Sequence, residues 1–102
     1  MRVAVIGAGG VGGTLGVLLA RQGQDVAFVA RGAHLEAMQA RGLRLRGRHG
    51  DVNLAPVRAT SDPRQVGEVD YALIAVKHYD LPSAMAALPP LLGPSTTLVP
   101  LL

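Results

Sequence analysis

The sequence has no cysteine and no tryptophan, and its only aromatic residues are two tyrosines and one phenylalanine. Without cysteine the chain cannot form a disulfide, a thiolate zinc site or a thiol nucleophile. It has no apolar run near the roughly 18 residues that a membrane-spanning helix needs. Its first apolar stretch is also too short for a signal peptide. These absences favour a soluble protein of a reducing compartment, and we expect it to be cytoplasmic, with no membrane partner.

The residues that are present suit one small domain with an aliphatic core. Hydrophobic residues make up 49% of the 102 residues, well above the share typical of disordered chains. Lys77 is the only lysine, so the net charge of +3 comes almost entirely from arginine. Four arginines lie close together: Arg41, Arg44, Arg46 and Arg48. Because few aromatic side chains could stack bases and no nucleic-acid motif is present, we interpret this cluster as a solvated edge and expect no nucleic-acid partner.

Apolar runs and turn residues predict an alternation of strands and helices. The expected strands are residues 3–6, 25–30, 70–77 and 95–102, and the expected helices are residues 11–22, 34–41 and 81–88. Between the second helix and the third strand, alternating apolar and charged residues around a Gly-Arg-His-Gly-Asp turn predict a hairpin, followed by a helical turn at 63–66. This order predicts an α/β fold: a Rossmann-type open, mostly parallel sheet with helices on both faces. Residues 1–102 would form a single domain.

The stretch between the first strand and the first helix fits the pattern G-x-G-x-x-G. It consists of Gly7, Ala8, Gly9, Gly10, Val11 and Gly12. After a strand and before a helix, this pattern is typical of a dinucleotide site, in which the glycines allow a tight turn and close approach of a pyrophosphate. The phosphate oxygens would meet free N–H groups at the helix N-terminus. The alternative is a glycine-rich turn that binds nothing.

The residue at the end of the second strand indicates which dinucleotide the site would hold. In an NAD site an acidic residue at this place bonds the ribose 2′-hydroxyl, about 20 residues beyond the fingerprint. Here the place is taken by Arg31, because the strand ends "FVAR". A guanidinium cannot accept a hydrogen bond from the ribose, but its planar fork suits the 2′-phosphate of NADP. We therefore predict a preference for NADP(H), the alternative being that Arg31 is merely a solvated residue after a strand.

Three segments resemble one family more closely than they resemble a generic dinucleotide fold. They are "MRVAVIGAGGVGG", "FVARGAHLEAMQARGLRL" and "DYALIAVKHYDLPSAMAALPPLLGPSTTLVPLL", and they resemble the N-terminal domain of ketopantoate reductases. The resemblance implies NADPH-dependent reduction of 2-dehydropantoate to (R)-pantoate, a step toward pantothenate and coenzyme A. It also implies that residues 7–12 hold the pyrophosphate, that Arg31 holds the 2′-phosphate and that Lys77 lies near the nicotinamide. A cation at the carboxyl end of a strand agrees with that place, although a strand-terminal lysine can also simply reach solvent.

The chain departs from the family pattern at its end. Family members continue with an Asn-Gly pair and a helical C-terminal domain that carries the catalytic lysine and a substrate-binding glutamate. We therefore expect this chain to be a truncated piece that binds cofactor but has no catalytic residue and little reductase activity. His34 and His49 are expected on the surface, and His78 and Tyr79 are assigned no role.

Other interpretations remain open at this point. The parent protein could reduce another small 2-oxoacid, since the missing domain would largely choose the substrate. The chain could also be a regulatory module that senses a dinucleotide and performs no chemistry. Exposed sheet surface at the last strand suggests that the chain could form a homo-oligomer.

Overall fold

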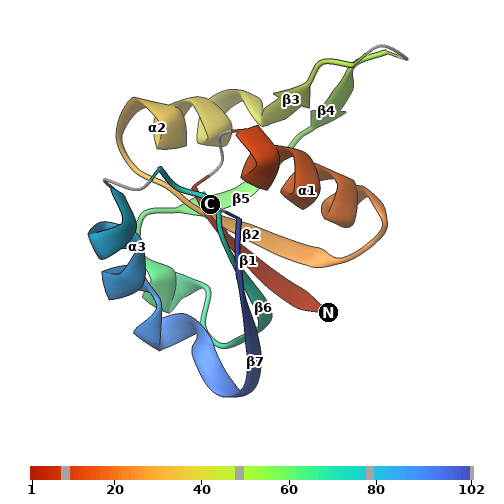
Figure 1. The fold of residues 1–102 in the computed structure, drawn as a ribbon. Coiled ribbons are helices and arrows are strands. Elements are labelled where there is room, and N and C mark those ends of the chain that lie inside the picture. Colours follow the sequence, from red (N-terminus) through yellow and green to blue (C-terminus); the bar gives the residue numbers. More distant parts are fainter. Residues whose placement is uncertain (8–9, 48–49, 78–79, 102) are drawn as a thin grey trace.

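The computed structural model describes residues 1–7, 10–47, 50–77 and 80–101 (Figure 1). A five-stranded sheet has the spatial order β5-β2-β1-β6-β7. Its strands are β1 (Arg2–Ile6), β2 (Asp25–Val29), β5 (Arg58–Thr60), β6 (Val69–Ile74) and β7 (Leu92–Pro100). The helices are α1 (Gly10–Arg21), α2 (Gly32–Arg41) and α3 (Leu81–Ala87), with short 3₁₀ turns η1 (Pro63–Gln65) and η3 (Pro89–Leu91).

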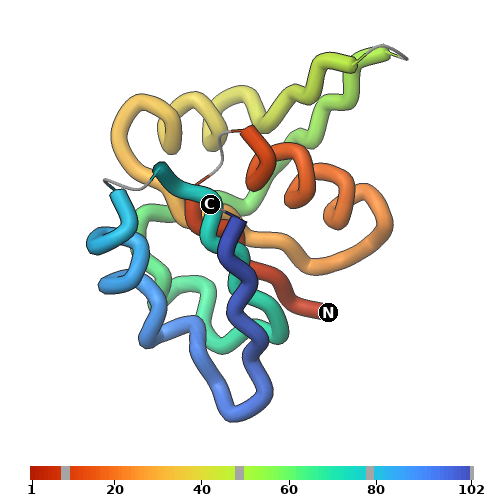
Figure 2. The backbone as a smooth tube through the Cα atoms, in the orientation of Figure 1, coloured from red at the N-terminus to blue at the C-terminus, as the bar shows by residue number. Residues whose placement is uncertain are grey.

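The sheet is the one that the alternation of elements predicts. All four strand pairs in it are parallel. Helices α1 and α2 lie on one face, and α3 lies on the other (Figure 2). The strand order matches that of doubly wound dinucleotide-binding folds, in which the first strand stands at the centre. The prediction of a Rossmann-type α/β domain is therefore confirmed.

The core consists of two layers, one on each side of the sheet, because alternate residues of a strand point to opposite faces. Along β1, Ala4 and Ile6 pack in the layer beneath α3, whereas Val3 and Val5 pack beneath α1 and α2. Both sets are buried, so β1 is apolar from Val3 to Ile6, after the exposed Arg2. The single phenylalanine, Phe28, is fully buried in the α1–α2 layer. The low aromatic content therefore leaves an aliphatic core, as the composition predicts.

Most predicted boundaries differ from the observed ones by one or two residues, two differ by three, and one strand was not predicted. β6 ends at Ile74 and not at Lys77, and β7 begins at Leu92 and not at residue 95. The unpredicted strand is β5, which pairs with the carboxyl half of β2. Its sequence, Arg-Ala-Thr, has no apolar run, so this edge strand depends on pairing with β2 and not on its own pattern.

The predicted hairpin forms, but it stands apart from the main sheet. Strands β3 (Leu43–Leu45) and β4 (Val52–Leu54) pair only with each other, in antiparallel register. The arginines at 41, 44 and 46 are exposed, as a solvated edge requires, and Arg48 lies outside the described residues. Among the helices that the structure describes, none has both the length and the apolar character needed to cross a membrane.

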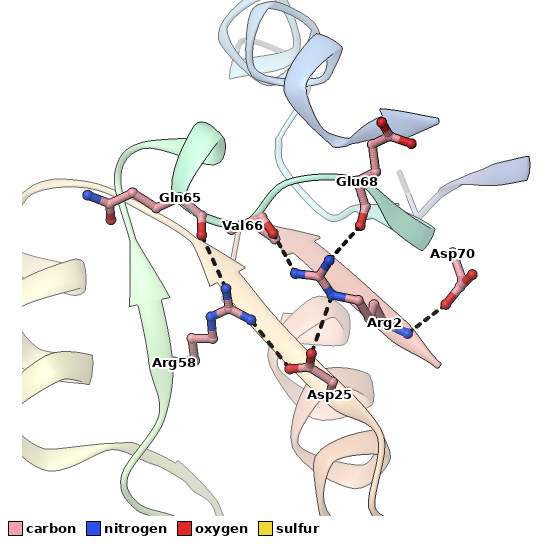
Figure 3. A network of polar contacts seen from close by, with 7 residues as sticks. All are labelled: Arg2, Asp25, Arg58, Gln65, Val66, Glu68 and Asp70. Carbon is pink, nitrogen blue, oxygen red and sulfur yellow. Dashed lines mark hydrogen bonds and ion pairs between the residues drawn. The ribbon is translucent and has the colours of Figure 1, made fainter. Parts of the chain in front are cut away.

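Polar contacts around Arg2 join the amino ends of four strands. We call this group, shown in Figure 3, the amino-end network; it comprises Arg2, Asp25, Arg58, Gln65, Val66, Glu68 and Asp70. The Arg2 guanidinium donates to the carbonyl oxygens of Val66 (2.6 Å) and Glu68 (3.1 Å) and lies 3.4 Å from the Asp25 carboxylate. Arg58 lies 3.5 Å from the same carboxylate. The network therefore holds the start of β1 against β2, β5 and the segment before β6.

Replacing Arg2 should lower the stability of the domain. In Arg2→Ala the carbonyls of Val66 and Glu68 lose their donor, which should reduce the free energy of unfolding by about 2 kcal/mol. Arg2→Lys keeps the charge but cannot donate to both carbonyls in the same planar geometry, so it should recover less than half of the loss. Urea unfolding followed by circular dichroism measures both changes.

Arg64→Ala provides the matched control. Arg64 pairs with Asp62 two residues away, and its side chain is 81% exposed. An exposed local pair of this kind contributes little to the free energy of unfolding, because water and salt screen it. Equal losses in Arg2→Ala and Arg64→Ala would contradict a special role for the amino-end network.

Candidate functional site

The turn between β1 and α1 leaves no room for side chains at two of its glycines. Gly7 has φ +87°, and a Cβ there would lie 2.7 Å from the backbone oxygen of Ala75. A Cβ on Gly12 would overlap the Ala75 side chain and approach the backbone oxygen of Gly7 to 2.7 Å. Gly12, the first buried residue of α1, therefore packs directly against the turn at Gly7. The tight turn that the sequence predicts fits the geometry at Gly7, and the contacts at Gly12 show that the helix also packs closely against this turn.

Of the other four residues in the G-x-G-x-x-G pattern, two belong to the described part of the chain. Ala8 and Gly9 lie outside the described residues. Gly10 and Val11 begin α1 and are exposed, and no atom of the described residues lies within 4 Å of the position that a Cβ on Gly10 would occupy. The N-terminus of α1 therefore faces open space at the carboxyl edge of the sheet, where its first N–H groups have no partner within the helix.

Gly16 explains the second close approach between α1 and the sheet. A Cβ at this position would lie 2.5 Å from the Cζ atom of Phe28. Glycine at this position therefore allows α1 to pack closely against the ring of Phe28. Gly13 is also buried.

Arg31 lies directly after β2, at the same edge of the sheet as Gly7. Gly7 donates its backbone N–H to the oxygen of Val29 (3.1 Å), which holds the ends of β1 and β2 together. Arg31 is exposed and has no ion-pair partner among the described residues. No acidic residue follows β2 before α2 begins. Asp25 lies at the opposite end of β2, in the amino-end network.

A cavity of about 300 Å³ opens at this edge, between α2 and α3. Its apolar lining comes from the strand ends and α3, and its polar lining comes from the connections after β2, β5 and β6 and from the first turns of α2 and α3. The residues that line it are Ile6, Gly7, Val29, Ala30, Arg31, His34, Ser61, Val76, Asp80, Ser83, Ala84 and Ala87. A cavity with this mixture of apolar and polar lining residues can hold an aromatic ring joined to a sugar phosphate.

Four polar lining residues were missed by the sequence reasoning: His34, Ser61, Asp80 and Ser83. His34 is on the helix surface, as expected, but this surface faces the cavity. Ser61 reaches the rim because it follows the unpredicted strand β5. The only signal available was their position after strands, since the carboxyl ends of parallel strands meet at one edge.

The connection that carries Ser61 is held by local polar contacts. Asp62 accepts from the backbone N–H of Arg64 (3.0 Å) and pairs with its guanidinium. The side-chain hydrogen bond from Arg64 lowers the pKa of Asp62, and the backbone hydrogen bond acts in the same direction. Thr60 donates to the side-chain oxygen of Gln65 (2.6 Å). These contacts hold the segment after β5 in place beside the cavity.

Lys77 lies at the same edge but outside the lining of the cavity. It is exposed and follows Val76, which does line the cavity. The Lys77 carbonyl accepts from the backbone N–H of Asp80 (2.8 Å), which turns the chain toward α3. Its predicted place near the nicotinamide therefore stays a prediction. His49, His78 and Tyr79 lie outside the described residues.

Sheet order, glycine turn and edge cavity together define a Rossmann-type α/β domain, the fold that carries dinucleotides in many oxidoreductases. A family model described as "Ketopantoate reductase PanE/ApbA" matches residues 3–102. The chain belongs to this family, whose members are oxidoreductases, and the resemblance seen in the sequence is confirmed.

Relatives show the same fold along the whole chain. A 2-dehydropantoate 2-reductase of Mesorhizobium japonicum is 45% identical over 100 residues, which are 97% of this chain and 30% of that protein. The crystal structure of a putative ketopantoate reductase from Ralstonia solanacearum MolK2 is 45% identical, with a TM-score of 0.90, over 97% of this chain and 30% of that one. The crystal structure of the 2-dehydropantoate 2-reductase from Geobacter metallireducens GS-15 is 32% identical in sequence, with a TM-score of 0.91. The match covers 99% of this chain and 33% of that one. This chain thus spans about a third of the length of the proteins it resembles.

Proposed function

We propose that this chain is the NADP(H)-binding part of a 2-dehydropantoate 2-reductase. The whole protein would use NADPH to reduce 2-dehydropantoate to (R)-pantoate, in the cytoplasmic synthesis of pantothenate and coenzyme A. Two of the relatives described above are 2-dehydropantoate 2-reductases, which supports this substrate. The cofactor choice is supported by the residues of this chain.

The observation that carries the cofactor assignment is the position of Arg31. Arg31 follows the end of β2 and lines the same cavity as Gly7. An acidic residue at this place would accept from the two ribose hydroxyls of NAD(H) and repel a phosphate. Arginine reverses both effects, because it offers paired N–H donors and a permanent positive charge to a 2′-phosphate.

The glycine turn also fits the proposed ligand. A side chain at Gly7 would meet the backbone oxygen of Ala75, and one at Gly12 would meet the Ala75 side chain and the Gly7 oxygen, so the turn has space for neither. The exposed start of α1 would place N–H donors and the positive end of the helix dipole at the pyrophosphate. The adenosine end would then lie toward Arg31, and the nicotinamide end would lie toward the side of β6 that leads to Lys77.

When bound, the cofactor would supply the hydride for reduction of the ketone. The part played by this chain is binding and orientation: residues 7–12 would hold the pyrophosphate, Arg31 the 2′-phosphate, and the Lys77 ammonium would lie near the reacting end. Positioning of this kind makes a large contribution to rate, because the reacting atoms must be held about 3–3.5 Å apart. We assign no proton donor for the ketone within this chain.

An NADPH-oxidation assay tests the proposal. The intact protein that contains this chain should oxidise NADPH in the presence of 2-dehydropantoate, with a kcat/KM at least about tenfold higher than for pyruvate, 2-oxoisovalerate or benzoylformate. A higher kcat/KM for another 2-oxoacid would reassign the substrate and leave the cofactor site in place. Binding of NADPH without turnover of any 2-oxoacid would instead favour a regulatory module.

A further inference from the structure

The cavity at the carboxyl edge contains a second side chain that can carry positive charge. His34 lines the cavity together with Arg31, and both are exposed. Among the described lining residues, Arg31, His34 and Asp80 are the ones that can be charged. Two of these three groups can therefore favour an anion, and both belong to the segment that follows β2.

Helix α2 holds His34 in a defined place. Met38, four residues further along the helix, is buried in the core, and residues four apart lie on the same face of a helix. The next residue, Gln39, donates from its side-chain amide to the backbone oxygen of Ala59 in β5 (3.1 Å). His34 therefore stands one turn above an anchored residue, over the end of the sheet and beside the cavity.

The polar groups of the cavity are divided between its two walls. Arg31, His34 and Ser61 follow β2 and β5 and form one wall, whereas Asp80 and Ser83 belong to the start of α3 on the other. A phosphate is repelled by the Asp80 carboxylate and attracted by the opposite wall. A ligand with one phosphate on its adenosine ribose would therefore direct that group toward Arg31 and His34.

We propose that His34 is a second specificity-determining residue for the ribose 2′-phosphate of NADP(H). The inference rests on the proposed preference for NADP(H) and extends it to a side chain one turn along α2. Arg31 offers a planar fork of donors to two phosphate oxygens, which leaves the third oxygen for another donor. The imidazole N–H of His34 supplies that donor.

Binding measurements on the intact protein test this role. Nicotinamide fluorescence gives the Kd of NADPH and of NADH for the parent and for His34→Ala and His34→Gln. His34→Ala should weaken NADPH binding about tenfold, equivalent to about 1.4 kcal/mol, and should leave NADH binding unchanged. His34→Gln keeps an N–H donor and should recover part of the loss.

Arg41→Ala is the matched control for this test. Arg41 is a cation on the same helix that borders a second hollow, between α2 and the hairpin. His34 borders both hollows, whereas Arg41 does not line the cavity at the carboxyl edge. If His34 acts by direct contact with the 2′-phosphate, and not through the total charge of α2, removing the Arg41 charge should have little effect. Arg41→Ala should then change the Kd of NADPH less than about twofold, because exposed charges at a distance are screened by salt.

Three outcomes would overturn the inference. These are equal weakening of NADPH and NADH in His34→Ala, no weakening of either, or an equal loss of NADPH binding in Arg41→Ala. Arg31→Ala in the same series separates this failure from failure of the proposed function. If Arg31→Ala abolishes the preference for NADPH and His34→Ala does not reduce it, only the role of His34 is wrong. If the parent shows no preference, the NADP(H) assignment itself is wrong.

Discussion

A Gly12→Ala variant is expected to lose both stability and cofactor binding. The added methyl group would overlap the Ala75 side chain and lie 2.7 Å from the Gly7 oxygen. Neither neighbour can easily move, because Ala75 donates to the oxygen of Ile6 (2.9 Å) and Gly7 donates to that of Val29 (3.1 Å). Helix α1 would have to shift away from the sheet, at a cost of about 2–3 kcal/mol in the free energy of unfolding.

The same shift would widen the turn that is proposed to hold the pyrophosphate. We expect the Kd for NADPH to rise at least about 30-fold, which corresponds to roughly 2 kcal/mol. Nicotinamide fluorescence gives the Kd, and urea unfolding gives the folded fraction needed to correct it. Both should be measured at a temperature where the variant is folded.

Gly16→Ala separates the two effects. Its methyl group would meet the Phe28 ring in the core, 2.5 Å from the Cζ atom, and not the turn. This variant should lose about 1–3 kcal/mol of stability, yet bind NADPH within about twofold of the parent once the unfolded fraction is subtracted. Parent-like binding in Gly12→Ala would show that the turn does not hold the cofactor.

Arg31→Ala should remove most of the discrimination between NADPH and NADH. The variant loses a paired, charge-assisted contact to the 2′-phosphate, and such contacts contribute about 3 kcal/mol, or roughly 100-fold in Kd. NADH binding should stay within about threefold, because its ribose carries no phosphate at this place. The ratio of the two Kd values is therefore the quantity to follow.

Two further observations make the Arg31 test sharp. Arg31→Lys keeps the charge but not the planar fork of donors. Its Kd for NADPH should therefore lie between that of the parent and that of Arg31→Ala. Raising the salt concentration should weaken NADPH binding to the parent more than to Arg31→Ala, since the removed charge is part of what salt screens. A parent protein that binds the two cofactors equally would refute the assignment.

Local sequence signals predicted the fold and the glycine turn well. β1 after Arg2 and β6 from Ala72 onward are buried on both faces, so each contains a short apolar run, residues 3–6 and 72–74, that is recognised without knowledge of its neighbours. The turn was equally recognisable, because Gly7 and Gly12 are required by contacts of the backbone within one strand–turn–helix unit and with the adjoining strand. Local structure can therefore be predicted from the sequence where neighbouring residues along the chain determine which residue type is allowed.

Elements that depend on distant partners were not predictable in this way. β5 is three residues long and is specified by its pairing with β2 and by the ion pair between Arg58 and Asp25. β7 begins early because its pairing shifts register between Val69 and Tyr71. The cavity likewise forms only when three separate connections meet, so no single segment of the sequence reveals that His34 and Asp80 share it.

The amino-end network and the glycine turn lie at opposite ends of β1. This strand has five residues and so separates them by roughly 17 Å, at about 3.3 Å per residue. Free-energy effects of substitutions more than about 7–10 Å apart usually add. The melting temperature and the cofactor preference of this domain should therefore be changeable independently. New charge pairs around Arg2 are expected to raise the melting temperature and to leave the preference between NADPH and NADH unchanged.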